Sequence, residues 1–296
     1  MSDTIESLSR KIHSAGDLQS VVRTMKALAA SSIGQYEKSV RALADYYHTV
    51  ELGLSAHFRE NESLIQQPLN SGEASEIDAV VFGSDQGLVG QFNDIIADYA
   101  IGILAALPGK PTIWAVGERV HTRLTDSGLA PIGLFPVPSS VEGIIPLVRQ
   151  LQIKSEAYRT GREQAPLYLF YNRPKSAPLF DPVSQRLLPL DKTWQRELAK
   201  PPWPTQSLPE VMGSSITTLA ALIREYLFIS LFRACAESLA GENASRLAAM
   251  QRAEKNIEEL LETLHGNYHR LRQSGIDEEL FDVISGYEAL EKKDYS

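Results

Sequence analysis

The sequence predicts an α+β fold in which a long antiparallel two-helix coiled coil, formed by the N- and C-terminal segments, carries an inserted small α/β domain. One observation is the placement of proline. All 16 prolines lie between Pro68 and Pro209, and both ends of the chain lack proline. Because proline interrupts helices, this distribution predicts two long helices around a globular centre. Hydrophobic spacing in the ends and alternating strand and helix patterns in the centre lead to the same fold.

The N-terminal segment shows apolar residues at alternating spacings of three and four, as expected for a coiled-coil seam. The pattern contains two phase changes, and the first falls at Gly16–Asp17, which we expect to be the weakest point of the helix. The seam residues are Ile5, Leu8, Ile12 and Ala15, then Leu18, Val22, Met25 and Ala29, then Ile33, Tyr36, Val40, Leu43, Tyr47, Val50 and Leu54.

The central segment, residues 75–195, alternates short buried-strand patterns with helical patterns, which predicts a small Rossmann-like α/β domain with a parallel sheet. The Pro/Ser-rich stretch 173–182 is expected to be a loop, and 185–190 a final edge strand. The other expected strands are 77–82, 112–116 and 167–171, and the expected helices are 92–107, 118–126 and 141–158.

The C-terminal segment repeats the heptad spacing from Met212 to Leu290 and predicts one helix of about 80 residues. Neither long helix can bury its apolar stripe alone. The simplest packing is against each other, and antiparallel, because the chain must return through the central domain. We therefore assign 1–60 and 208–296 to a coiled-coil shaft and 196–207 to a linker. The longer C-terminal helix should extend past its partner.

Composition excludes several classes of protein. The chain has 29 basic and 37 acidic residues, a net charge of −8, which argues against wholesale nucleic-acid binding. A single cysteine, Cys235, cannot form an intrachain disulfide or a cysteine-rich metal site and suits a reducing compartment. There is no signal-peptide pattern, and the longest apolar stretch, 219–236, is broken by Arg224, Glu225 and Arg233. We expect a soluble protein, or one that meets a membrane only through partners.

A glycine-rich turn, with Gly83, Gly87 and Gly90, follows the first expected strand. Such a turn could cradle a phosphate, but the spacing is not G-x-G-x-x-G and no P-loop lysine follows. A structural turn, in which glycine permits sharp bending and close packing, is the favoured interpretation. Nearby, Ser84 and Asp85 have no histidine partner that the sequence can locate, so a nucleophile is not expected there.

Metal and cofactor sites are not expected. His265 and His269 lie four residues apart on a predicted helix and could share a metal, but no third ligand has a convincing spacing. We therefore expect no catalytic residue, no cofactor and no metal.

The first helix is locally basic. Residues 10–41 contain six basic side chains against two acidic ones, Asp17 and Glu37. This segment could face an acidic partner, or it could pair with a complementary flank of the other helix. The basic residues are Arg10, Lys11, Arg23, Lys26, Lys38 and Arg41.

Four motifs in order resemble the γ subunit of F-type ATP synthases. Val22–Ser31 resembles the first-helix motif of that family, and Gly83–Asn93 its glycine turn. Glu237–Met250 resembles the last-helix signature, and Tyr268–Gly286 the final motif. Because these motifs span nearly the whole chain, they are more specific than the heptads alone.

The resemblance implies a non-catalytic central-stalk rotor that couples ion flow through the membrane c-ring to ATP synthesis or hydrolysis. Its expected partners are the three-fold ring of α and β subunits, the ε subunit and the c-ring. The expected location is the cytoplasmic face of the bacterial inner membrane, as a peripheral membrane protein. Residues at matching family positions, expected to contact the α/β ring, are Met25, Lys26, Glu242, Arg246, Arg272 and Gln273.

The sequence also departs from the family pattern. Gln86, Val89 and Gln91 replace the usual residues of the glycine turn, and Asp277 stands where a small hydroxyl residue is common. These differences indicate a divergent or alternate branch and leave open whether the transported ion is a proton or sodium. Two other functions stay open at this point: a stand-alone α/β enzyme with a coiled-coil dimerisation element, and a coiled-coil scaffold.

Overall fold

The computed structural model of this chain comprises two compact units, which are described separately. One consists of Met1–Leu28 with Ala248–Ser296, and the other of Ala29–Leu247. The predicted seam residue Met212 and the tail after Asp294 lie outside the described residues. The structure describes residues 4–60, 76–159, 162, 165–175, 180–190, 192–201, 203, 205–207, 209 and 214–294.

Helices form both ends of the described chain, as predicted. They are α1 (Ile5–Ala42), α2 (Ala44–Glu60) and α8 (Ser215–Asp294), and α8 has 80 residues, in agreement with the expected length. The predicted weak point at Gly16–Asp17 is wrong, because α1 runs through it and the interruption falls at Leu43. A helical glycine costs only about 1 kcal/mol relative to alanine, too little to break a packed helix.

The buried seam of α1 is a strict seven-residue repeat with no phase change. Leu8, Ala15, Val22, Ala29 and Tyr36 are all buried. The two predicted phase changes are therefore wrong for α1. The sequence pattern obscured this repeat because two of its members are alanines, whereas the larger side chain of Leu18 is 53% exposed.

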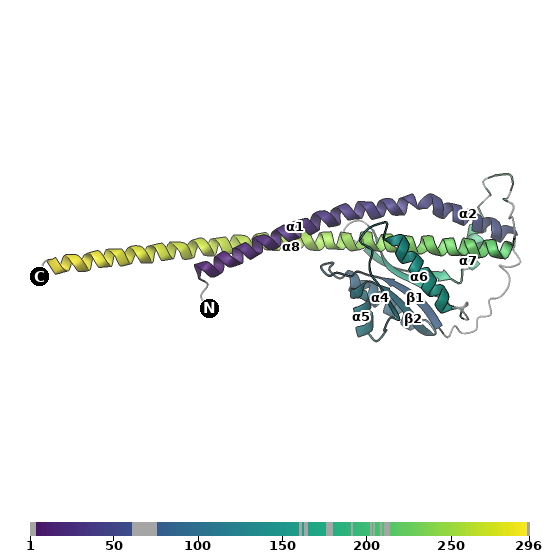
Figure 1. The fold of residues 1–296 in the computed structure, drawn as a ribbon, viewed down its shortest axis with the longest axis horizontal. Coiled ribbons are helices and arrows are strands. Elements are labelled where there is room, and N and C mark those ends of the chain that lie inside the picture. The colour runs from purple at the N-terminus through teal and green to yellow at the C-terminus, as the bar shows by residue number, and fades with distance from the viewer. Residues whose placement is uncertain are drawn as a thin grey trace. The chain divides into compact units, whose positions relative to one another are not determined.

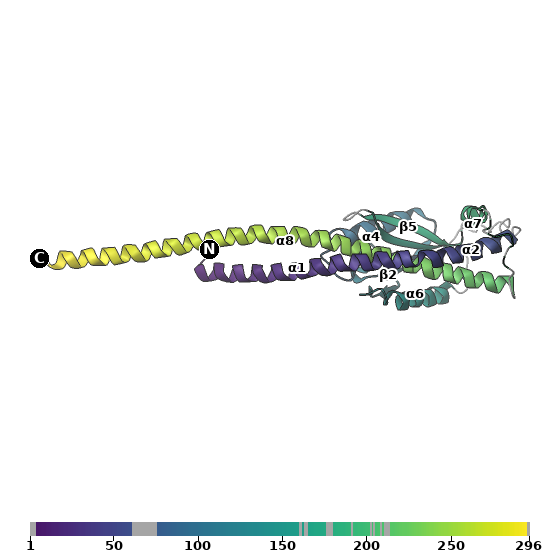
Figure 2. The same ribbon diagram turned by 90° about the horizontal axis from the view of Figure 1, so that it is seen from above.

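In the Ala29–Leu247 unit, α2 and the start of α8 run antiparallel (Figures 1 and 2). The Tyr46 hydroxyl donates to Glu225 over 2.6 Å, and Ser215 lies 3.5 Å from His57. Between these pairs, a Cβ at Gly53 would lie 2.8 Å from the end of the Leu222 side chain, so any larger residue would require Leu222 to shift. The residue numbers of the contacts on α8 fall as those on α2 rise, so the two helices are antiparallel.

The inserted domain is built on a five-stranded sheet with the order β3-β2-β1-β4-β5. β1, β2, β3 and β4 are parallel where they pair, but β5 pairs antiparallel with β4. The expectation of a purely parallel sheet is thus corrected to a mixed sheet with an antiparallel edge. The strands are β1 (Glu76–Phe82), β2 (Lys110–Val116), β3 (Gly133–Phe135), β4 (Leu167–Pro174) and β5 (Phe180–Leu188).

Two helical layers cover the two faces of this sheet. One face packs on α4 (Phe92–Ala106) and α5 (Glu118–Asp126), through residues such as Val81 and Ile96. The other face packs on α6 (Ile144–Arg159) and on α8, through residues such as Leu169. Figure 2 shows α4 and α6 on opposite sides of β2. Because both faces of the sheet are covered, β1 is buried from Ile77 to Phe82, and its sequence is almost continuously apolar apart from Asp78.

Two elements were not predicted. The short strand β3 was missed, and helix α7 (Lys192–Ala199) occupies part of the proposed linker and the end of the proposed domain. The edge strand was placed at 185–190, whereas β5 begins at Phe180. Four residues of the predicted 173–182 loop, 176–179, lie outside the described residues. The domain boundaries themselves stay a prediction.

In the other unit (Met1–Leu28 with Ala248–Ser296), which we call the helix-pair unit, the N-terminal part of α1 packs antiparallel on the C-terminal part of α8. Gln19 donates to Glu258 over 3.4 Å, and Arg23 donates to Glu254 over 2.9 Å. Leu264 shares an apolar cluster with Leu8. These contacts fix the register of the two helices in this unit.

One described helix, α8, passes a length and hydropathy test for a membrane span. The observation is weak evidence, because part of the apolar window is buried inside the chain. Tyr226, Ile229 and Phe232 belong to the core shared with the sheet.

Candidate functional site

The glycine turn between β1 and α4 needs glycine at some positions and not at others. A Cβ at Gly83 would lie 2.5 Å from the Val120 Cβ and 2.7 Å from Asn93 Oδ1, so a side chain does not fit. Gly90 has φ 58° and Leu88 has φ 63°, both in the left-handed region. A Cβ at Gly87 would meet only the Arg119 guanidinium, at 3.9 Å. Packing and backbone geometry therefore explain Gly83 and Gly90, and neither explains Gly87.

The polar side chains of the turn hydrogen-bond to the protein itself. The backbone N–H of Ser84 donates to Asn93 Oδ1 (2.9 Å), and Asn93 Nδ2 donates to Ser84 Oγ (2.8 Å). The Asp85 carboxylate accepts the N–H groups of Glu118 (3.0 Å) and Val137 (2.8 Å). Asp85 thus joins three loops at the carboxyl end of the sheet, and it satisfies a free N–H at the start of α5.

The turn is also attached to α8. Ser245 Oγ donates to the Val89 carbonyl oxygen over 2.5 Å. One turn earlier on α8, a Cβ at Gly241 would lie 3.3 Å from the Asn172 carbonyl oxygen on β4. Asn172 in turn donates to the Phe92 carbonyl over 2.9 Å. The glycine turn and the α8 signature, far apart in sequence, therefore form one joint between sheet and helix.

Glu242 and Arg246 lie in the same stretch of α8 and pair with each other. Arg246 Nη2 donates to Glu242 Oε1 over 2.5 Å, and the two side chains are only 13% and 6% exposed, respectively. Burial raises the pKa of Glu242, while the Arg246 charge opposes that rise. Both were predicted to contact the α/β ring. In this structure they are enclosed by their own chain, so the partner role stays a prediction.

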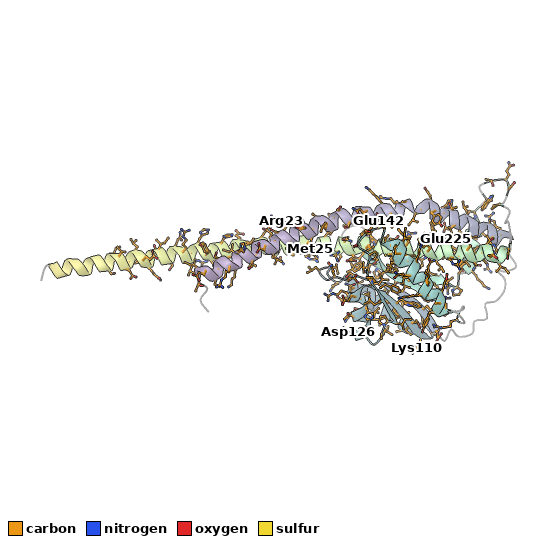
Figure 3. All side chains as sticks on the ribbon, viewed as in Figure 1. Arg23, Met25, Lys110, Asp126, Glu142 and Glu225 are labelled. Carbon is orange, nitrogen blue, oxygen red and sulfur yellow. The ribbon has the colours of Figure 1, made fainter. Side chains whose placement is uncertain are left out.

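Met25 lies on α1 in the helix-pair unit (Figure 3), and Lys26 follows it on the same helix. Met25 is half-buried against Val22 and Met250. The Lys26 ammonium forms an ion pair with Glu254 of α8. Of the two interpretations of the basic first helix, pairing with a complementary flank is therefore what the structure shows at this residue.

Arg272 and Gln273 are exposed on α8. His265 and His269 stack with ring centroids 6.5 Å apart. Within the described part of the chain, no group of three or more metal-ligating side chains comes together. These residues thus share a helix without forming a common site.

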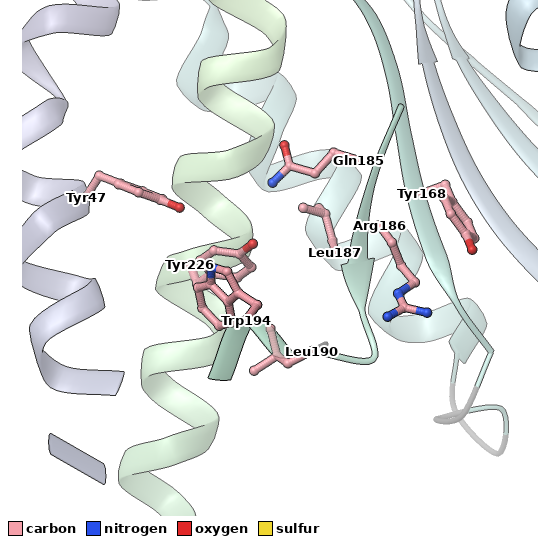
Figure 4. A pocket seen from close by; sticks show the side chains of 8 residues that line it. All are labelled: Tyr47, Tyr168, Gln185, Arg186, Leu187, Leu190, Trp194 and Tyr226. Atoms are coloured by element: carbon pink, nitrogen blue, oxygen red, sulfur yellow. The ribbon is translucent and has the colours of Figure 1, made fainter. Parts of the chain in front are cut away.

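Sequence reasoning missed a cavity of about 470 Å³ next to α7 (Figure 4). Trp194 of α7 packs on Tyr226 of α8 with centroids 5.1 Å apart, and Tyr47 of α2 lies 6.3 Å from Tyr226. The lining residues are Tyr47, Tyr168, Gln185, Arg186, Leu187, Leu190, Trp194 and Tyr226. The cavity could not be found from sequence because its aromatic residues come from separate elements.

A buried ion pair was also missed. Arg159, at the end of α6, donates to Asp78 of β1 over 3.0 Å, and Arg162 lies 3.6 Å from the same carboxylate. Burial raises the pKa of Asp78, and the two arginines oppose the rise. An acidic residue within an apolar strand is the signal that could have indicated this pair.

Comparison with known proteins gives one family. A family model described as ATP synthase matches residues 4–290. The chain is 26% identical over 302 residues to the ATP synthase gamma chain of Syntrophus aciditrophicus, covering 97% of this chain and 99% of the relative. It is 24% identical over 286 residues to the ATP synthase gamma chain of Cupriavidus pinatubonensis, with 95% and 97% covered.

Solved structures show the same fold. The rotor of the Euglena gracilis mitochondrial ATP synthase aligns with a TM-score of 0.60 at 15% identity, covering 92% of this chain and 98% of that chain. The central stalk and c-ring structure of the Tetrahymena thermophila enzyme gives a TM-score of 0.58 at 21% identity, with 79% and 99% covered.

Proposed function

The chain belongs to the ATP synthase family, and we propose that it is the γ subunit, the central-stalk rotor of the complex. The observation that carries this is the family match over residues 4–290, which includes both long helices and the sheet domain between them. The family model therefore matches the whole architecture of the chain and not one domain of it. Ion flow through the membrane ring is thereby coupled to ATP synthesis or hydrolysis by rotation.

The shaft is the antiparallel pair of α1 and α8, wound as a left-handed coiled coil. A strict seven-residue repeat of buried residues in α1 supports this, because an α-helix has 3.6 residues per turn and must supercoil to keep such a seam buried. On α8, Met250, Ile257 and Leu264 are buried at the same spacing. Two packed helices resist twisting better than one, which suits a part that transmits torque.

The mechanism follows from asymmetry. One shaft cannot contact three equivalent catalytic sites equally, so each orientation of the shaft favours a different conformation at each site. This is a population shift driven by differential contacts. Rotation then takes every site through all conformations in turn. Catalysis belongs to the β subunits, and the γ chain contributes contacts that change with angle.

The partners are the α and β subunits, the ε subunit and the c-ring, and the place is the cytoplasmic face of the bacterial inner membrane. The names of the similar structures support these partners, since they describe rotor, central stalk and c-ring assemblies. Met25, Lys26, Arg272 and Gln273 are the proposed contacts with the α/β ring that are not enclosed by the chain itself. Glu242 and Arg246 would reach the ring only if their local packing opened.

A crosslink tests the proposal. Met25→Cys is combined with a cysteine in an acidic loop of the β subunit, and ATP turnover of the assembled complex is measured before and after oxidation. The native Cys235 is buried, and burial raises its pKa, so it should not compete. We expect oxidation to stop turnover and reduction to restore it. Unchanged turnover in a complex with a verified crosslink would rule out rotation of this chain.

A matched control separates rotation from general damage. The same cysteine in β is oxidised in a complex whose γ chain keeps Met25, so that no bond to the shaft can form. This control complex should keep its turnover under both conditions. Loss of activity in the control as well would identify general oxidative damage, and not blocked rotation, as the cause of the lost turnover.

A further inference from the structure

Four charged side chains form a compact cluster in the helix-pair unit, and we call it the tip quartet: Arg23 and Lys26 of α1, with Glu254 and Glu258 of α8. Arg23 Nε donates to Glu254 Oε1 over 2.9 Å, and Arg23 Nη2 lies 3.4 Å from Glu258 Oε1. The Lys26 ammonium pairs with the other oxygen of the Glu254 carboxylate. Glu254 is therefore the centre of the quartet, with one oxygen on each cation.

Glu254 differs in exposure from the residues around it. Its side chain is 15% exposed, whereas Lys26 is 36% and Arg23 is 56% exposed. Both basic neighbours lower the pKa of Glu254. A carboxylate held in this way stays ionised near neutral pH, so the quartet carries two positive and two negative charges.

The position of the quartet gives it a consequence for a rotor. Lys26 adjoins Met25, and both are among the proposed contacts with the α/β ring. An uncompensated cation there would form ion pairs with acidic groups of the ring in some shaft orientations and not in others. Such pairs lower the free energy of the shaft at particular angles and slow the rotational steps that leave those angles.

We propose that Glu254 is an internal counter-charge that weakens the ion pairs of Lys26 and Arg23 with acidic groups of the surrounding ring as the shaft turns. This rests on the proposed function. It assigns Glu254 a role that acts through its ion pairs with Arg23 and Lys26. The side chains of Arg23 and Lys26 are paired with Glu254 and Glu258 of α8, so the charges of the tip quartet sum to zero.

The test is Glu254→Gln in the assembled complex, with ATP turnover measured from low to high salt. We expect turnover to fall roughly two- to threefold at low salt, the size of one exposed ion pair, and to recover as salt screens the freed cations. Glu259→Gln is the matched control. Glu259 lies on the same helix, is 65% exposed and pairs only with Lys255 at 3.8 Å among the contacts described, so the control should behave as the unmodified complex.

A second variant separates charge exposure from loosened packing. Glu254→Gln with Lys26→Gln lacks the ion pair just as the single variant does, but it leaves one cation fewer on the surface. If exposed charge slows the shaft, the double variant is faster at low salt than Glu254→Gln alone. If weaker helix pairing is the cause, the double variant is no faster, and that result overturns the inference.

The outcomes also distinguish this inference from the proposed function. Glu254→Gln with unmodified turnover at every salt concentration overturns the counter-charge role, while the Met25 crosslink can still stop rotation. Unchanged turnover in a complex with a verified crosslink overturns the rotor itself, whatever the salt dependence. A readout besides turnover is the affinity of the full chain for the isolated α/β ring, which should become higher and more salt-dependent in Glu254→Gln.

Discussion

The two units of this chain use the same helix, α8, in opposite ways. Between Tyr226 and Ser245, most α8 side chains are buried, on every side of the helix, against the sheet and the other helices. From Ala248 onward, α8 buries a single seam, with Met250, Ile257 and Leu264, while Leu280 and Phe281 are more than half exposed. The first segment is stabilised by burial all round, and the second by a narrow stripe and exposed charges.

Local packing therefore gives the two segments of one helix different surfaces. The apolar window of α8 that is long enough to span a membrane is only 28% buried in the chain, whereas the stretch 234–245, which is buried throughout, contains Glu237, Glu242 and Asn243. A helix with one seam keeps a polar surface and leaves its remaining apolar residues for partners. Stability is therefore expected to lie mainly in the Ala29–Leu247 unit and partner contacts mainly in the helix-pair unit.

The largest contrast is expected between two arginines. Arg159→Ala should lower the free energy of unfolding by about 4 kcal/mol, because it leaves the fully buried Asp78 carboxylate without its main counter-ion. Arg23→Ala, which breaks an exposed pair, should have a much smaller effect. Urea unfolding of the full chain, followed by circular dichroism, measures both. Equal losses would contradict the comparison.

The Arg159–Asp78 ion pair also makes the free energy of unfolding depend on pH. The pKa of Asp78 is raised in the folded chain, and it rises further without Arg159. A raised acid pKa means that the folded state holds its proton more tightly than the unfolded state, so stability falls as pH increases through the folded pKa. The penalty of Arg159→Ala should therefore shrink on acidification. A penalty that grows at low pH would contradict this account.

The next contrast is between two leucines on α8. Leu231 is 3% exposed in the core shared with the sheet, and Leu264 is 9% exposed in a small cluster with Leu8. Leu231→Ala should cost about 3 kcal/mol, as a cavity in a close-packed core does. Leu264→Ala should cost about 2 kcal/mol, at the low end of the range for buried leucines, because a thin seam next to solvent can relax. The same unfolding measurement compares them, and a larger loss at Leu264 would reverse the comparison.

The smallest contrast lies within the glycine turn. Gly83→Ala should cost about 2 kcal/mol, since the added methyl group meets Val120 and Asn93 at less than 3 Å. Gly87→Ala should leave stability nearly unchanged, since its nearest neighbour is the movable end of Arg119 at 3.9 Å. Thermal unfolding of both variants measures the difference. A destabilised Gly87→Ala would point to a role that packing does not explain.

Much of the fold could be predicted because it depends on local patterns. Proline placement, heptads and strand-helix alternation located the long helices, most of the sheet and the glycine turn. α7 was missed because it lies between prolines and has no fully buried residue, with Trp194 and Leu198 only partly buried against the core. The strict seam of α1 was missed because Ala15 and Ala29 are weak signals beside the exposed Leu18.

The candidate site could be predicted less well, because its contacts join residues far apart in the sequence. The register that places Glu254 between Arg23 and Lys26 depends on which turn of α8 faces which turn of α1. The enclosure of Glu242 and Arg246 likewise depends on how the sheet packs on α8. Motif resemblance identified the positions, and only the structure showed which of them are already paired within the chain.

The aromatic contact between Trp194 and Tyr226 has a practical consequence for optical measurements. The three tryptophans of the chain, Trp114, Trp194 and Trp203, all belong to the Ala29–Leu247 unit. Indole emission therefore reports on the sheet-bearing unit alone and is silent about the helix pair. A tryptophan introduced beside Leu264 would add an indole to the helix-pair unit. The emission that this variant gains over the unmodified chain would then follow melting of the helix pair separately from melting of the domain.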